Sequence, residues 1–119
     1  MLSVTKLFEF EAAHYLPDHL GLCKNLHGHS YKLEVEVSGL MNESGMIMDF
    51  SDLKKIINDS IIEKYDHILL NNYFYLPTAE TMVSYFVGIV TVFLQSTTVT
   101  LERIRLWETS SGYCEWRRD

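Results

Sequence analysis

The sequence has few basic residues and few cysteines, and both shortages narrow the class of protein. Ten Lys and Arg against sixteen Asp and Glu give a net charge of −6. That balance argues against nonspecific binding to nucleic acid or to an anionic membrane, which needs a basic face. Only two cysteines, Cys23 and Cys114, occur in 119 residues. With a cytoplasmic location as the default, we expect both to be reduced thiols.

The sequence also lacks a long apolar run. The longest apolar segment, residues 82–94, is too short to span a bilayer and follows a helix cap, so it predicts a buried helix. The first fourteen residues carry Lys6, Glu9 and Glu11 where a secretory signal needs an uninterrupted apolar stretch. The composition, 47% apolar and 22% charged, is typical of a globular protein. We therefore expect residues 1–119 to form a single domain located in the cytoplasm.

Two stretches alternate between apolar and polar residues, which predicts strands with one buried face. In residues 3–14, one parity contains Phe8, Phe10, Ala12 and His14. In residues 27–37, one parity contains His27, His29, Tyr31, Leu33, Val35 and Val37. The segment between them, residues 15–26, holds turn-forming residues and predicts a connecting loop. Paired as an antiparallel hairpin, the two strands place His14 beside His27 and His29 on the apolar face.

The remaining elements predict two helices followed by two strands. In chain order they are residues 49–64, 78–95, 98–108 and 113–118. Asp49 and Thr78 are suitable N-caps for the two helices. The apolar parity of the third strand switches near Glu102–Arg103, which predicts a bulge. The order ββααββ predicts an α+β domain: a four-stranded antiparallel sheet with two helices on one face.

Three histidines at one end of a hairpin face suit a metal ion. Residues i and i+2 of a strand point the same way, so His27 and His29 form a natural chelating pair. A single His-x-His pair is a weak signal, and the addition of His14 strengthens it. Neutral imidazole is a preferred ligand of Zn²⁺, and three protein ligands with an open position describe a catalytic zinc site.

Four further residues have chemistry that fits this place, and each has an ordinary alternative. Cys23 is a candidate base or nucleophile, a candidate fourth metal ligand, or an inert loop cysteine, and its spacing leaves these alternatives level. Asp66 and His67 form either a proton-handling pair or a simple polar connector. Glu108 either accepts two hydrogen bonds from an amidine-like edge or is a solvated strand end.

These segments together resemble one known family. The chain contains, in order, "FEAAHYLP", "CKNLHGHSYKLEVEVSG", "GMIMDFSDLK", "YDHILLN", "PTAE" and "WETSSG". The combination is similar to the 6-pyruvoyl-tetrahydropterin synthase / 6-carboxytetrahydropterin synthase family over nearly the whole chain. The resemblance implies the tunnelling fold, in which three subunits close a barrel of strands. It further implies that two trimers stack into a homohexamer.

The resemblance also implies roles for the candidate residues. It assigns Zn²⁺ to His14, His27 and His29, as the hairpin argument suggests, and it makes Cys23 the catalytic base. It also implies an Asp–His pair that works with this cysteine and is supplied across a subunit boundary, and a carboxylate that anchors the pterin ring. In this sequence the pair corresponds to Asp66 and His67, and the anchoring carboxylate corresponds to Glu108.

The short gap between cysteine and histidines points to one branch of this family. Only three residues separate Cys23 from His27, which resembles the bacterial-type 6-carboxytetrahydropterin synthases of the queuosine pathway. These lyases convert 7,8-dihydroneopterin triphosphate to 6-carboxy-5,6,7,8-tetrahydropterin, acetaldehyde and triphosphate. The pyruvoyl synthases, which eliminate triphosphate without cleaving the side chain, have a longer insert. The alternative to both enzymes is a non-catalytic, zinc-containing oligomer that binds pterins.

A triphosphate substrate needs positive charge that the chain as a whole lacks. Candidates for a locally positive patch are Lys24, Arg103, Arg105, Arg117 and Arg118. The sequence does not place these five side chains relative to one another.

Overall fold

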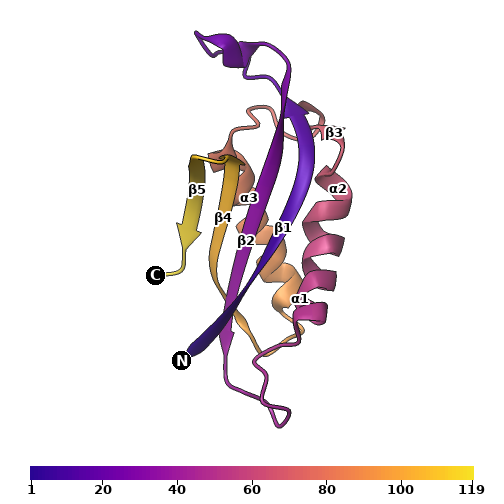
Figure 1. Cartoon of the computed structure of the whole chain (residues 1–119), viewed down its shortest axis with the longest axis vertical. Helices are drawn as coiled ribbons and strands as arrows, with labels where there is room; N and C mark the ends of the chain where they lie inside the picture. The colour runs from indigo at the N-terminus through magenta and orange to yellow at the C-terminus, as the bar shows by residue number, and fades with distance from the viewer.

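The structure is a computed structural model that describes residues 1–119. Figure 1 shows one sheet with its helices gathered on one side. The strands are β1 (Leu2–His14), β2 (His27–Gly39), β3 (Ile68–Leu69), β4 (Thr100–Thr109) and β5 (Gly112–Arg117). The helices are α1 (Phe50–Ile57), α2 (Glu63–Tyr65) and α3 (Ala79–Leu94), with a π-helical turn at Asn58–Ile62 that joins α1 to α2. Short 3₁₀ turns occupy Leu22–Lys24 and Leu70–Asn72.

The sheet has five strands in the order β3-β1-β2-β4-β5, so the expectation of four purely antiparallel strands is wrong in one respect. The additional strand β3 runs parallel to β1 and pairs only Ile68 and Leu69 with it. A two-residue strand shows no alternation, so periodicity cannot detect it. The α+β order of two strands, helices and two strands is otherwise as expected.

Polar contacts at Asp66 hold β3 against β1. The backbone N–H of Glu11 donates to Asp66 Oδ1 at 2.9 Å, and the backbone N–H of His67 donates to the Glu11 carbonyl. His67 has a positive φ of 62°, which turns the chain sharply between α2 and β3. A non-glycine residue in this conformation is uncommon and indicates a constrained turn. The Asp-His dipeptide is therefore a structural joint as well as a candidate for proton chemistry.

Both helices begin where their caps predict. The Asp49 side chain accepts from the backbone N–H of Ser51, and the Thr78 side chain accepts from the backbone N–H of Thr81. The first helical stretch is not uniform, because its middle is the π-helical turn. There the Ser60 hydroxyl donates to the Ile56 carbonyl at 2.7 Å, which competes with the regular helical hydrogen bonds.

The core lies between the helices and the apolar parity of the sheet. It contains 23 buried apolar residues, among them Phe10, Tyr31, Leu33, Phe86 and Ile104. The bulge predicted near Glu102–Arg103 is confirmed, since Arg103 pairs with Glu36 and Leu101 pairs with the next residue, leaving Glu102 without a partner in β2. The bulge returns Leu101 to the buried face. Burial of this face fixes the register of β1 on β2, and the register in turn places the histidines.

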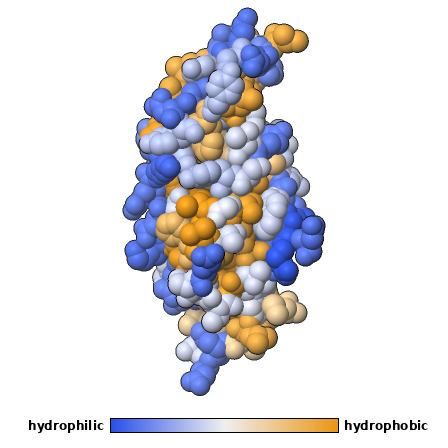
Figure 2. All heavy atoms as spheres, turned by 180° about the vertical axis from the view of Figure 1, so that it is seen from behind, coloured by the Kyte–Doolittle hydropathy of each residue, from blue (hydrophilic) through white to orange (hydrophobic).

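The face that carries the helices exposes apolar side chains. Seen from behind, apolar residues gather in its middle, with polar residues around them (Figure 2). On α3, Tyr85, Val92 and Phe93 are exposed by 43%, 56% and 37%. No helix has the length and apolar character needed to cross a membrane.

Candidate metal centre and active site

The strand register brings three histidines together at one end of the hairpin. His14 pairs directly with His27, and Ala12 pairs with His29, so all three histidines lie on the helix-bearing face. Their ligand atoms all lie within 4.8 Å of one another, and the ring centroids are 4.6 to 5.0 Å apart. The juxtaposition inferred from alternation alone is thus present in the structure.

Backbone carbonyls orient two of the rings. His14 Nδ1 lies 2.8 Å from the Pro77 carbonyl oxygen, and His27 Nδ1 lies 2.7 Å from the Asn25 carbonyl oxygen. A carbonyl only accepts, so each Nδ1 carries the N–H, and each neutral ring presents an Nε2 lone pair. Those two Nε2 atoms lie 3.1 Å apart. A proton or a metal ion shared between the two nitrogens would satisfy both lone pairs, and backbone carbonyls are typical partners of metal-ligating histidines.

The third ring completes the arrangement. His29 Nε2 is buried and has no hydrogen-bond partner, a costly condition for a nitrogen. Burial lowers the pKa of His29, and the neighbouring His14 and His27 lower it further, against the opposing effect of Glu108. The ring therefore favours the neutral form that a metal requires. The three histidines form a site that could hold a metal ion.

Glu108, near the end of β4, lies against this cluster. Its Oε1 atom is 3.5 Å from His14 Nε2 and 3.7 Å from His29 Nε2. Its side chain is 35% exposed. The carboxylate is not a member of the group of mutually close histidine atoms, so it lies over one edge of their triangle. The sequence did not predict this contact, because Glu108 is 94 residues from His14 and 79 residues from His29 along the chain.

Cys23 lies in the 3₁₀ turn of the loop that connects β1 to β2 (Figure 1). Its carbonyl accepts from the backbone N–H of Leu16, which closes the base of the loop at 2.8 Å. The side chain is partly exposed and makes no disulfide. It does not belong to the group of mutually close metal-ligating atoms. In this geometry the three histidines meet without the thiol, which favours the open site over the closed one.

Asp66 and His67 lie beside β1, at the joint with β3. His67 Nδ1 is 2.9 Å from Asp66 Oδ1, and the imidazole is 77% exposed. The pKa of the Asp66 carboxyl is lowered, chiefly because the Glu11 N–H donates to it, with a further contribution from His67. The ionised Asp66 carboxylate thus lies within hydrogen-bonding distance of an exposed imidazole.

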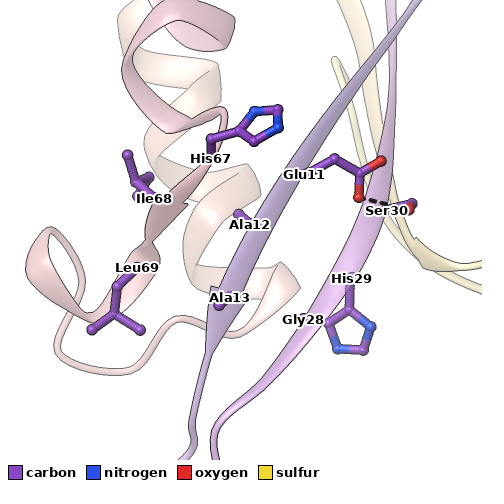
Figure 3. Close-up of a pocket in the computed structure, with 9 residues that line it drawn as sticks. All are labelled: Glu11, Ala12, Ala13, Gly28, His29, Ser30, His67, Ile68 and Leu69. Atoms are coloured by element: carbon purple, nitrogen blue, oxygen red, sulfur yellow. Dashed lines mark hydrogen bonds between the residues drawn. The ribbon is translucent and has the colours of Figure 1, made fainter.

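Two open hollows adjoin the cluster. One, of about 460 Å³, has His29 and His67 on its rim (Figure 3). Figure 3 shows these two residues on either side of β1, with the Ser30 hydroxyl bonded to Glu11 at 2.7 Å. The other hollow, of about 550 Å³, is lined by His29, Glu108 and Lys32 among others. Lys32 was not among the candidates from the sequence. It belongs to the polar parity of β2, whereas the histidines belong to the apolar parity, so the pattern did not associate it with the site.

The four candidate arginines do not form a free positive patch. Each faces a carboxylate of its own sheet: Arg103 faces Glu34 and Glu36, Arg105 and Arg117 face Glu115, and Arg118 faces Glu102. Cross-strand pairing explains the contacts of Arg103 and Arg105, which stand opposite Glu36 and Glu34 in the register. Arg117 instead contacts Glu115 two residues away on the same strand. Lys24 and Lys32 make no ion pair in the structure, and Lys32 lines the hollow beside His29 and Glu108.

Solved structures share this fold. The structure of Caenorhabditis elegans 6-pyruvoyl tetrahydropterin synthase matches with a TM-score of 0.85 at 22% identity, over 99% of this chain and 96% of that one. The Plasmodium vivax 6-pyruvoyltetrahydropterin synthase structure matches with a TM-score of 0.75 at 17% identity, over 100% and 99%. At these identities the likeness establishes the fold alone.

Sequence relatives extend the likeness. The 6-carboxy-5,6,7,8-tetrahydropterin synthase of Haemophilus influenzae is 34% identical, over 98% of this chain and 99% of its own. The protein of the same name from Bacillus subtilis is 30% identical, over 96% and 84%. The family model described as 6-pyruvoyl tetrahydropterin synthase matches residues 3–119. The chain therefore belongs to the 6-pyruvoyl tetrahydropterin synthase family.

Proposed function

We propose that this chain is a 6-carboxy-5,6,7,8-tetrahydropterin synthase, a lyase that acts on 7,8-dihydroneopterin triphosphate. The products are 6-carboxy-5,6,7,8-tetrahydropterin, acetaldehyde and triphosphate. The observation that carries the proposal is the convergence of three histidine ligand atoms within 4.8 Å, in a chain whose near-full-length relatives bear that name. The reaction needs no redox cofactor, because the pterin ring is reduced by redistribution of the substrate's own protons and electrons.

The proposed metal is Zn²⁺, held by His14, His27 and His29. Neutral imidazoles suit this ion, and three protein ligands leave room for substrate oxygen. When bound, zinc acts as a Lewis acid that polarises a coordinated side-chain hydroxyl and makes the adjacent protons more acidic. The carbonyls of Pro77 and Asn25 keep the His14 and His27 rings aimed at this position.

Cys23 is the proposed base that takes a proton from the substrate's side chain. A cysteine acts as a base in its thiolate form, and Cys23 lies in the loop that joins the two histidine-bearing strands. Asp66 and His67 are proposed to relay that proton. The His67 imidazole is exposed in the single chain, which is compatible with its serving the site of a neighbouring subunit. Asp66 stays ionised beside it and holds the imidazole in position.

Glu108 is the proposed anchor of the pterin ring. A carboxylate accepts two parallel hydrogen bonds from an amidine-like edge, which fixes both the position and the angle of the ring. Its partial exposure beside the 550 Å³ hollow leaves its oxygens accessible. Lys24 and Lys32 are proposed partners of the triphosphate, because the arginines already face carboxylates.

The proposed assembly is a homohexamer made of two trimers, in the cytoplasm. Both edges of the sheet are available for it: β3 pairs with only two residues of β1, Ala12 and Ala13, and β5 has no strand on its outer side. Unpaired edges of this length expose a row of backbone hydrogen-bonding groups that invite strands of another chain. Closing a barrel of strands from several chains satisfies those groups.

The test is one reaction with purified, zinc-loaded protein and 7,8-dihydroneopterin triphosphate. We expect acetaldehyde, detected as it forms by a coupled alcohol dehydrogenase, and 6-carboxy-5,6,7,8-tetrahydropterin by mass. The three-residue gap from Cys23 to His27 favours this outcome, because loop length sets where the thiolate lies relative to the substrate. Release of triphosphate with a pyruvoyl product and no acetaldehyde would assign the chain to the other branch. Pterin binding without turnover would make it a binding protein.

A further inference from the structure

We propose that Glu108 is an exchangeable fourth ligand of the metal held by His14, His27 and His29, and that it leaves the metal when a pterin binds. The inference rests on the proposed function, because it concerns the same metal and the same pterin. It adds a second position for a carboxylate that otherwise serves only as an anchor for the substrate.

The spacing of the polar atoms matches a tetrahedral metal site. Metal–ligand bonds of about 2.0–2.2 Å at tetrahedral angles place neighbouring ligand atoms about 3.3–3.6 Å apart. His14 Nε2 and His27 Nε2 are 3.1 Å apart. Glu108 Oε1 is 3.5 Å from His14 Nε2 and 3.7 Å from His29 Nε2. Three of the six edges of such a tetrahedron are therefore already near their required lengths, and two of the three involve Glu108.

The chemistry of the cluster favours a carboxylate in this place. His29 Nε2 is buried without a hydrogen-bond partner, and Glu108 supplies the anion closest to it. Carboxylate oxygen is an ordinary fourth ligand beside imidazole nitrogen at zinc. Glu108 lies over the edge between His14 and His29, outside the close group that includes His27. Contact with all three histidines would need a rotation of the Glu108 side chain that brings its oxygen over the centre of the triangle.

The position of Glu108 also allows it to leave. The side chain is 35% exposed and lines two hollows, one shared with His29 and Lys32 and the other with Glu80 and Cys114. The carboxylate cannot bind the metal and accept two hydrogen bonds from a pterin edge with the same oxygens. Pterin binding would thus withdraw Glu108 and open the fourth metal position at the moment when the side-chain hydroxyl arrives to occupy it.

The experiment compares wild-type protein, Glu108→Gln and Glu9→Gln. Glu9 lines the same 550 Å³ hollow and makes no contact with the histidines, so its variant controls for the loss of one negative charge. Zn²⁺ affinity is measured by competition with a chelator. Protein loaded with Co²⁺ instead of Zn²⁺ reports the ligand set through its visible absorption spectrum. Each spectrum is recorded before and after addition of neopterin.

We expect Glu108→Gln to weaken Zn²⁺ binding by about 10-fold or more, at least the loss that follows when a group supporting a metal ligand is removed. Its Co²⁺ spectrum should differ from that of the wild type, whereas Glu9→Gln should match the wild type in both measurements. Neopterin should change the wild-type spectrum, because Glu108 leaves the metal.

Equal Zn²⁺ affinity and identical Co²⁺ spectra in wild type and Glu108→Gln would overturn the inference. The proposed function would survive that result if wild-type protein still released acetaldehyde. Wild-type protein that binds neither metal would instead remove the metal site itself, and the proposed function with it. A loss of affinity equal in Glu108→Gln and Glu9→Gln would also overturn the inference, since it would reflect general charge.

Discussion

Replacing His29 by alanine is expected to abolish metal binding while leaving the fold intact. His29 is one of the three histidines that could hold the metal, and the two that remain form a weak site for zinc. Its Nε2 is the one buried side-chain nitrogen or oxygen without a partner in the structure. The variant therefore removes a buried nitrogen that a bound metal would satisfy.

The metal-free stability should change little. Leaving a buried nitrogen unsatisfied costs about 1–3 kcal/mol, and alanine removes that cost. The same substitution gives up the packing of the imidazole, which contacts the Tyr31 ring at a centroid distance of 5.6 Å. The side chain of His29 is 17% exposed, at the edge of an open hollow, so its removal leaves no closed cavity. These opposing effects are of similar size.

The stability in the presence of zinc should differ sharply. A ligand at 100 times its Kd stabilises the folded state by about 2.7 kcal/mol. For a domain of this length, each kcal/mol shifts Tm by roughly 4 °C, which gives a rise of roughly 10 °C for the wild type. In His29→Ala the same zinc concentration should produce a rise of no more than about 1 °C, because binding is far from saturation.

The assay is thermal unfolding followed by circular dichroism, with and without zinc, together with metal analysis of the dialysed protein. His19→Ala is the matched control, because His19 is an exposed histidine in the loop between β1 and β2 and lies outside the cluster. It should keep the full zinc-dependent rise in Tm. A wild-type rise in His29→Ala, or one bound zinc per chain in that variant, would refute the three-histidine assignment.

Three further perturbations test other parts of the site and its scaffold. Cys23→Ala should keep zinc affinity and Tm while turnover falls by about 100-fold or more, as expected for a lost base; a drop in zinc affinity instead would make the thiol a ligand. Asp66 has a lowered pKa in the folded state, so its contribution to stability is present above the unfolded value of about 3.9 and is lost as pH falls further. Urea unfolding of Asp66→Asn should therefore show a shallower loss of stability below pH 4 than wild type, and parallel curves would contradict the role of this carboxylate. Arg103→Ala removes an 11%-exposed guanidinium and leaves Glu36 without its cationic partner, and it should cost about 1.5–3 kcal/mol in urea unfolding. Arg118→Ala, at a 51%-exposed pair, should cost less than about 1 kcal/mol, and equal costs would show that burial does not matter here.

Much of the hairpin could be predicted, because alternation constrains strands strongly. A shift of one residue would have moved every apolar side chain of residues 27–37 to solvent, so the burial pattern settled the register of β1 on β2. The caps at Asp49 and Thr78 were equally readable, since their side chains act within three residues of themselves. Even the bulge at Glu102 was visible as a switch of parity. Each of these features is local or depends on one pair of strands.

Other features depend on contacts that no local pattern records. Strand β3 exists because Asp66 and His67 bind the backbone of Glu11, more than fifty residues away. The arginines expected to serve the triphosphate are held by carboxylates on neighbouring strands. Which charges meet is decided by the order of strands in the sheet, and that order is a property of the whole fold.

The amino-acid sequence by itself determined the histidine cluster that could hold a metal ion, because His14, His27 and His29 share one parity of two strands joined by one loop. The tertiary structure alone decided what surrounds those ligands. It brought the Pro77 carbonyl to His14 and the Glu108 carboxylate to His14 and His29, from segments more than sixty residues distant along the chain. The physical reason is that the alternation of side chains is a property of each strand by itself. The partners of a buried polar atom are instead set by the elements that pack around it.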